Sequence, residues 1–386
     1  MRSSVLLALV LSLMTSCVCV QKEAVALQPE LELFLPEVIY AVPGVEMNVY
    51  FDNLVRVTNP ANYVFDVNCP KGRNDQMRWR FLPTEKDIGT YDWNVRVFGQ
   101  NGLLAQGGCK LVVSPLNTVE SRPLSILVVG DSLTAATAYP ERIFALSKDP
   151  GKLAMKMIGS RGRGPERSAI PGGVAHEGYG GWTWNSFATG KNSKFLQFPE
   201  GDNTKPGTLN FQAFLDQYND GKAPDVITVM LGINDIFGAQ DDNIESKITA
   251  IFEKMEVLLT EFRKVAPEAL IGVALIPPGA GSQDAFGANY TCGQTRWQYH
   301  KNQRRYNAAL TAKFQAANPL NISLVPVYIN LDCQNNYPQL TSEVNHGNPA
   351  KITRLNNGVH PSTAGYNQIG DTFFSWLMAQ LNKEKR

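Results

Sequence analysis

The stretch that decides the fold is ILVVGDSLT, residues 126–134, in which an apolar run ends abruptly in Gly-Asp-Ser. A short, continuous apolar run closed by a turn is typical of a strand that is buried on both faces. Similar runs follow at 226–231, 270–276 and 322–329. Between them lie helical patterns, such as the apolar stripe at spacings of three and four from Ile248 to Phe262. We therefore predict an α/β fold, a three-layer sandwich in which helices cover both faces of a parallel sheet.

The chain before this sheet has another pattern. Short runs rich in β-branched and aromatic residues are separated by turn residues, at 46–51, 63–67, 77–81, 91–97 and 110–113. Regularly spaced short strands of this kind predict a small all-β, antiparallel sandwich, with Trp79 and Trp93 in its core. We predict a β-sandwich accessory domain at 27–115, a linker at 116–123 and the α/β domain at 124–386.

The N-terminus carries the pattern of a secretory leader. Arg2 precedes a largely apolar, uncharged run at 5–14, which is too short to cross a bilayer, since that takes about 20 residues, but is typical of a signal peptide. Two forms of processing stay open: removal of residues 1–26 after Ala24-Val25-Ala26, or lipid anchoring through Cys17. Both predict a secreted or periplasmic protein without a transmembrane segment.

The nearly neutral charge of the chain bears on its partners. The chain has 36 Lys and Arg against 35 Asp and Glu, a formal charge of +1, which argues against nucleic acid or an anionic membrane as partner.

Four of the six cysteines follow the leader, and an oxidising compartment favours disulfides. Of three connectivities we favour Cys69 with Cys109 and Cys292 with Cys333, because each pair stays within one domain. With four His and no CxxC or HExxH, we expect no metal or other cofactor.

Four short strings occur where predicted strands end or just before the last predicted helix. They are GDSLT at 130–134, GYGGWT at 178–183, LGIND at 231–235 and GVHP at 358–361. In this order they resemble the blocks of the SGNH, or GDSL, hydrolase family, over the part of the chain from about Ser125 to the C-terminus. The resemblance implies a flavodoxin-like sheet and a serine ester hydrolase.

The resemblance also assigns roles to residues. Ser132 matches the nucleophile and His360 the base, and the oxyanion donors are the backbone N–H of Ser132, the backbone N–H of Gly181 and the side-chain amide of Asn234. Ester hydrolysis needs a nucleophile, a base and oxyanion donors, so these residue types suit the reaction. Asp131 and Asp235 are expected to tie loops through side-chain to backbone hydrogen bonds.

One position departs from the family. Three residues before the histidine the family carries an aspartate, which orients the imidazole, and here Asn357 stands in its place. Three explanations stay open: the Asn357 oxygen accepts from the ring of His360, or Glu177 or Glu343 supplies a carboxylate, or the enzyme is weak. Asn357-Gly358 is also the dipeptide most prone to deamidation, so ageing can generate an aspartate.

The resemblance implies a function as well. We expect a secreted esterase that removes acetyl groups from a polysaccharide or oligosaccharide, with Tyr179, Trp182 and Trp184 offering aromatic faces to a sugar ring. Two alternatives stay open: a carbohydrate-binding or surface protein whose SGNH domain has little or no activity, and a lipase or thioesterase of the same family.

Overall fold

The computed structural model describes residues 31–116, 122–148 and 153–383. The predicted leader at 1–26, with Cys17, and most of the predicted linker lie outside the described residues. Among those residues, none of the helices combines the length and the apolar character needed to cross a lipid bilayer.

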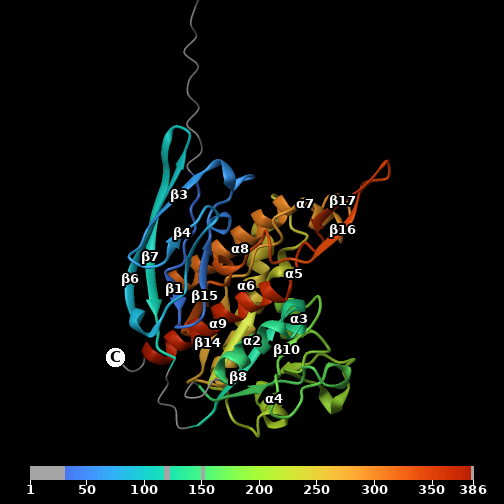
Figure 1. Ribbon diagram of the computed structural model, residues 1–386. Coiled ribbons are helices and arrows are strands. Elements are labelled where there is room, and N and C mark those ends of the chain that lie inside the picture. The colour runs from blue at the N-terminus through green and yellow to red at the C-terminus, as the bar shows by residue number, and fades with distance from the viewer. Residues whose placement is uncertain (1–30, 117–121, 149–152, 384–386) are drawn as a thin grey trace, which may run out of the picture. The chain divides into compact units, whose positions relative to one another are not determined.

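A parallel sheet forms the centre of the C-terminal part, as predicted (Figure 1). Its path is β10 (Glu177–Gly178), β8 (Leu124–Gly130), β13 (Val226–Met230), β14 (Leu270–Ala274) and β15 (Ile322–Val325), and β9 (Met155–Ile158) also pairs with β8. All these pairs are parallel. The last predicted run is shorter than expected, because the strand ends before Pro326 and a 3-10 helix, η6 (Val327–Asn330), follows.

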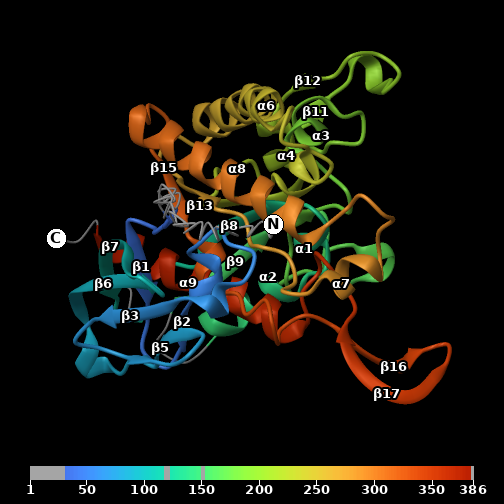
Figure 2. The same cartoon turned by 90° about the horizontal axis from the view of Figure 1, so that it is seen from above.

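Helices cover both faces of this sheet, which confirms the three-layer α/β fold. α9 packs against α2 and contacts β15, while α6 packs against α3, α4 and α8 (Figure 2). The predicted stripe from Ile248 to Phe262 is the buried face of α6. The helices are α1 (Ser132–Ala135), α2 (Ala138–Ser147), α3 (Trp184–Thr189), α4 (Phe211–Tyr218), α5 (Ile233–Ile236), α6 (Ile244–Val265), α7 (Gln283–Gly287), α8 (Arg296–Ala316) and α9 (Thr363–Lys383).

The N-terminal strands form two sheets, also as predicted. One has the order β1 (Val38–Ala41), β7 (Gly102–Val113), β6 (Gly89–Gly99) and β3 (Val64–Asn68), and the other has β2 (Met47–Tyr50), β5 (Arg78–Phe81) and β4 (Arg73–Asn74). Trp79 and Trp93 meet between the sheets edge to face, with ring centroids 6.2 Å apart. One pair departs from the antiparallel pattern, because β1 runs parallel to β7.

The β-sandwich and the α/β part form one packed body. Residues Leu31 to Arg386 are a single compact unit, and one apolar core runs through both parts. Asn53 Nδ2 donates to the carbonyl oxygens of Tyr328 and Leu331, each at 2.8 Å. From α8, the buried Arg304 donates to the carbonyl oxygen of Leu54 at 2.7 Å. The strand pattern alone predicted a separate accessory domain and gave no sign of these contacts.

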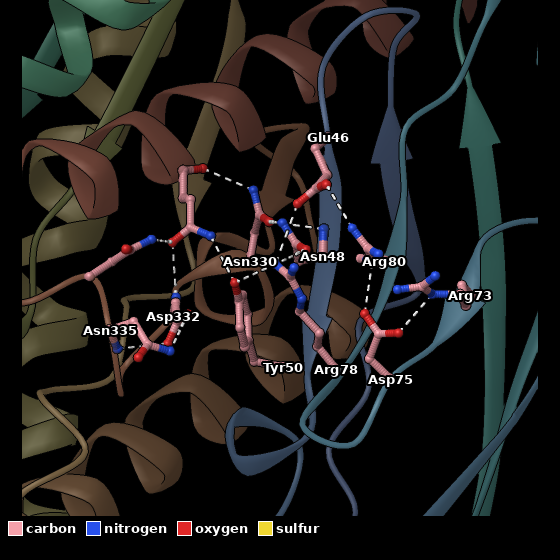
Figure 3. A network of polar contacts seen from close by, with 12 residues as sticks. Glu46, Asn48, Tyr50, Arg73, Asp75, Arg78, Arg80, Asn330, Asp332 and Asn335 are labelled. Atoms are coloured by element: carbon pink, nitrogen blue, oxygen red, sulfur yellow. Dashed lines mark hydrogen bonds and ion pairs between the residues drawn. The ribbon is translucent and has the colours of Figure 1, made fainter.

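A polar network continues this junction (Figure 3). The backbone N–H of Asn48 donates to Asn330 Oδ1 at 3.0 Å. On α9, Gln368 donates to the Tyr50 hydroxyl at 3.2 Å and accepts from the backbone N–H of Asp332 at 2.9 Å. The sandwich is thereby hydrogen-bonded to the end of η6 and is linked through Gln368 to Asp332 in the segment that follows.

Both predicted disulfides are absent, because all four described cysteines are free thiols. Cys69 directly follows β3, and β6 lies between β3 and β7, which carries Cys109. Two strand spacings of about 4.8 Å exceed the Cα separation of about 4.4–6.8 Å that a disulfide needs. Cys333 is buried with its thiol donating to Asn53 Oδ1, whereas Cys292 is exposed.

Two hairpins and several short 3-10 helices were not predicted. The hairpin of β16 (Gln339–Asn345) and β17 (Asn348–Leu355) stands out from the α/β part, and its second strand leads directly to Asn357 (Figure 2). A smaller hairpin pairs β11 (Leu196–Gln197) with β12 (Thr208–Leu209). The remaining 3-10 helices are η1 (Phe51–Asn53), η2 (Pro60–Asn62), η3 (Glu85–Asp87), η4 (Pro165–Arg167) and η5 (Pro199–Gly201).

Replacing Asn53 with Ala tests the junction. The change leaves the buried carbonyl groups of Tyr328 and Leu331 without their donor, so we expect the free energy of unfolding to fall by about 2–4 kcal/mol. Urea unfolding followed by circular dichroism measures it. Gln106→Ala, at an exposed position of the same sandwich, is the control and should cost less than about 0.5 kcal/mol. Equal effects of the two changes would contradict a stabilising junction.

Candidate active site

The motif residues meet at the carboxyl edge of the parallel sheet. Gly130, the last residue of β8, lies in register with Met230 of β13 and with Gly178 of β10. The strings containing Ser132, Asn234 and Gly181 each begin where one of these strands ends, and loops at this edge of an α/β sheet are where ligands bind. The topology therefore gathers three strings that are far apart in the sequence.

Ser132 and His360 are hydrogen-bonded. Ser132 Oγ lies 2.8 Å from His360 Nε2, although 228 residues separate them. Ser132 opens α1, where Asp131 Oδ1 caps the helix by accepting from the N–H of Leu133 at 2.9 Å. His360 comes from the loop that precedes α9, and both side chains are half-buried. This is the geometry of a nucleophile next to its general base.

Asn234 links the other two loops of the site. Its Nδ2 donates to the carbonyl oxygen of Trp182 at 2.9 Å and lies 3.5 Å from Asp131 Oδ2. The side chain thus joins the loop of Gly181 to the loop of Ser132. Among the described residues, the backbone N–H groups of Ser132 and Gly181 have no acceptor within the protein. These are the two backbone donors that the resemblance assigns to the oxyanion.

The loop at Gly181 is open to solvent. Gly181 has a φ of +75°, a left-handed conformation that favours glycine. A Cβ atom built at Gly180 or Gly181 meets no other atom within 4 Å. Space for a substrate is therefore free beside the proposed oxyanion donor.

Two buried carboxyl groups lie next to these loops. Burial raises the pKa of Asp131 to about 7, with a further increase from the nearby Asp235. Burial likewise raises the pKa of Asp235 to about 7. Asp235 Oδ1 accepts from the backbone N–H of Trp184 at 3.3 Å. Both residues bind backbone N–H groups, as predicted, and both favour the neutral form at mildly acidic pH.

Asn357 does not contact the imidazole ring. Its Oδ1 accepts from the backbone N–H groups of Val359 at 3.1 Å and of His360 at 2.8 Å, so it closes the turn that carries the histidine. The prediction that this oxygen accepts from the ring N–H is therefore wrong. The Asn357 oxygen instead accepts from two backbone N–H groups, whose positions could not be predicted from the sequence.

Neither glutamate supplies the missing carboxylate. Glu177 is buried, where it accepts from the Tyr179 hydroxyl at 2.6 Å and from the backbone N–H of Ser160. Glu343 lies on the exposed hairpin and pairs with Lys351 at 3.3 Å. Both suggestions are wrong. Burial is the single cause acting on His360, and it lowers the pKa of the imidazole.

The three aromatic residues have different surroundings. Trp184 is fully buried and its Nε1 donates to the Tyr306 hydroxyl at 3.1 Å, so its predicted contact with sugar is wrong. The Tyr179 ring stacks on Trp182, at 4.0 Å between ring centroids, and the guanidinium carbon of Arg161 lies 5.2 Å from the centre of the Tyr179 ring. Tyr179 thus packs against side chains of the protein. Trp182 is half-buried beside Gly181 and remains a candidate for substrate contact.

His176 is a residue of this region that the motifs did not indicate. Its Nδ1 accepts from the backbone N–H of Gly178 at 3.1 Å, and its Nε2 lies 3.0 Å from Thr137 Oγ1. Burial lowers the pKa of His176 to about 4, so it is neutral and holds the start of the Gly181 loop. No local signal in the sequence distinguishes it from an ordinary core histidine.

The described residues contain no group of three or more His, Cys, Asp or Glu side chains arranged to hold a metal ion.

Residues 126–373 match the profile of the family described as GDSL-like lipase/acylhydrolase. The chain belongs to this family. It is accordingly a carboxylic ester hydrolase with the α/β fold derived above. A comparison with curated proteins finds no match.

Several solved structures are similar to the chain at low identity. A family 3 carbohydrate esterase of Clostridium thermocellum has 19% identity and a TM-score of 0.41, over 68% of this chain and 98% of that one. A family 3 carbohydrate esterase of Talaromyces cellulolyticus has 17% identity and a TM-score of 0.40, over 67% and 99%. A lipase from a goat rumen metagenome has 12% identity and a TM-score of 0.36, over 65% and 95%. Values this low do not carry a substrate over to this chain.

The pH dependence of ester turnover should report the state of His360. Neutral imidazole is the base, and burial without a carboxylate lowers its pKa, so kcat/KM should rise with a midpoint below the ordinary histidine value of about 6.5. Initial rates with p-nitrophenyl acetate across pH measure the midpoint. His346→Gln, at an exposed hairpin position, should leave the profile unchanged. A midpoint above the ordinary value would instead indicate a carboxylate partner.

Proposed function

We propose that the protein is a secreted or periplasmic serine esterase that removes acetyl groups from a carbohydrate through an acyl-enzyme on Ser132. The observation that carries this proposal is the 2.8 Å contact of Ser132 Oγ with His360 Nε2. Export is supported by the leader pattern at the N-terminus.

The reaction uses the residues in a fixed order. His360 Nε2 takes the hydroxyl proton while Ser132 Oγ attacks the ester carbonyl carbon. The developing oxyanion accepts from the N–H groups of Ser132 and Gly181. It also accepts from the N–H of Asn234 Nδ2 that does not bind the Trp182 carbonyl, which exchanges its long 3.5 Å contact with Asp131 for the oxyanion. Each donor is worth about 2.7–4 kcal/mol. His360 then protonates the leaving alcohol. A water molecule, deprotonated by His360, hydrolyses the acyl-enzyme and frees acetate.

The surroundings of the site leave room for a bulky alcohol as the leaving group. Space is free around Gly180 and Gly181, and Ser132 and His360 are half-buried, so a large leaving group can approach from solvent. Trp182, which is half-buried and stacks on Tyr179, directly follows Gly181 in this loop.

A second candidate is a carbohydrate-binding protein with residual esterase activity. Its support is the absence of a carboxylate contact with His360 among the described residues, since loss of that partner costs a serine protease about 10⁴ in kcat. Turnover measurements separate the two candidates.

Ser132→Ala should almost abolish hydrolysis of p-nitrophenyl acetate. Loss of the nucleophile in a serine hydrolase costs about 10⁶ in kcat, which here leaves only a small residual rate from binding and the oxyanion donors. Ser246→Ala, at an exposed site on α6, should retain the wild-type rate. A wild-type rate no higher than that of Ser132→Ala would favour the binding protein.

Trp182→Ala should discriminate between substrates. If the indole face binds sugar, kcat/KM for an acetylated oligosaccharide should fall about three- to tenfold more than for p-nitrophenyl acetate, since an aromatic stack contributes about 0.5–1.5 kcal/mol. Trp297→Ala on α8 is the matched control, because Trp297 is also half-buried. An equal loss on both substrates would mean that Trp182 only packs.

A further inference from the structure

Asn357 lies in the loop that carries His360 and has no role in the proposed reaction. It precedes Gly358, and its side-chain oxygen is held by two backbone N–H groups, those of Val359 and His360. We propose that Asn357 is a self-modification site, which the folded protein converts to aspartate rather than to isoaspartate. The conversion itself does not depend on the proposed function, and only its effect on activity rests on that function.

The reaction needs only water and base. Hydroxide removes the Gly358 amide proton, and the nitrogen attacks Asn357 Cγ to form a new C–N bond. The Cγ–Nδ2 bond breaks and ammonia leaves, which gives a five-membered succinimide. Water then opens the ring at one of its two carbonyl carbons. Opening at Cγ restores the normal backbone with an aspartate side chain, whereas opening at the former backbone carbonyl yields isoaspartate.

The two N–H donors assist the attack on Cγ. Negative charge develops on Oδ1 when the Gly358 nitrogen adds, and Oδ1 already accepts from His360 N–H at 2.8 Å and Val359 N–H at 3.1 Å. Donors aimed at an oxygen that gains charge lower the barrier, as in an oxyanion hole. The proton that must leave is held only loosely, since Gly358 N–H donates to Asn289 Oδ1 at 3.3 Å.

The same contacts direct the ring opening. While the two donors polarise the Cγ carbonyl, water attacks there and regenerates the normal backbone. Isoaspartate would instead add a methylene to the backbone before Gly358. The surroundings resist that shift, because the Gly358 carbonyl accepts from Ala280 N–H at 2.9 Å and a Cβ built on Gly358 would lie 3.0 Å from Phe286. The fold therefore favours aspartate.

The product places a carboxylate in the turn that carries the base. The Asn357 side chain is already bonded to the backbone of His360, so the new negative charge lies within one turn of the imidazole. A nearby carboxylate stabilises the imidazolium and raises its pKa. Conversion should therefore raise the pH midpoint of the rate, and it should raise kcat above that midpoint because the imidazolium formed in the reaction is stabilised.

The chain contains its own control, Asn101-Gly102. This dipeptide lies in the exposed turn between β6 and β7, and within the described part of the chain no hydrogen bond reaches the Asn101 side chain. Asn101 can therefore deamidate, but nothing polarises its Cγ carbonyl or restrains its backbone. The two sites report on one sample under identical conditions.

The first experiment maps both sites by peptide mass spectrometry with electron-transfer fragmentation. Wild-type protein is incubated at mildly alkaline pH, and each modified peptide becomes about 1 Da heavier. We expect mainly aspartate at position 357 and mainly isoaspartate at position 101, and in urea the ratio at position 357 should fall to that at position 101. Conversion at 101 without conversion at 357, or equal ratios in the folded protein, would overturn the proposal.

The second experiment follows activity during the same incubation. The rate with p-nitrophenyl acetate should rise with the fraction of aspartate at 357 and approach that of Asn357→Asp. Asn357→Gln, which is not set up to form the five-membered ring, should not gain activity. A falling rate as aspartate accumulates would overturn the catalytic consequence. No turnover by any variant would count against the proposed esterase function, while the mass ratios would still decide the modification.

Discussion

Parallel pairing of β8 with β13 is the constraint on which the site depends. The register that sets Gly130 beside Met230 brings the ends of both strands to one edge, so Ser132 and Asn234 emerge together. β10 extends the same edge through Gly178, which delivers Gly181. A slip of one residue in either pairing would turn a buried strand's side chains to the opposite face. The positions of the oxyanion donors are therefore fixed by the register of the buried strands.

His360 does not lie on the sheet and needs another support. The segment after η6 is bonded to the sandwich through Asn53 and to α9 through Gln368, and the carbonyl oxygen of Asn336 in this segment accepts from Ser362 N–H at 2.9 Å. Ser362 is two residues beyond the base. The sandwich thus helps to hold the loop that carries His360, through the segment that follows η6. An appended domain without such contacts would have no effect on the position of this loop.

The sequence was sufficient for features that depend on local pattern and insufficient for those that depend on distant neighbours. Buried strands, the α6 stripe and the Ser132 turn each carry a local signal. Trp184 and Trp182 look alike in the sequence, but α3 turns only the former toward Tyr306. The pairing of Cys69 with Cys109 failed because domain membership does not reveal the strand between them. The sequence favoured a hydrogen bond from the His360 ring to Asn357. It could not show that the backbone N–H groups two and three residues after Asn357 take this oxygen, because their position depends on the shape of the turn.

Burial acts on the acids and the base of this site in opposite directions, with one result. It lowers the pKa of His360 and raises those of Asp131 and Asp235 to about 7, so burial favours the neutral form of all three groups. Charge then separates only during the reaction, when His360 becomes imidazolium and the ester oxygen becomes an oxyanion. Because no carboxylate within 31–116, 122–148 or 153–383 contacts the imidazole, the stabilisation of that charge falls mainly to the N–H donors. A negative charge at position 357 would help to stabilise the imidazolium of His360. Conversion of the Asn357 amide to a carboxylate would therefore reduce the share of the stabilisation that the N–H donors provide.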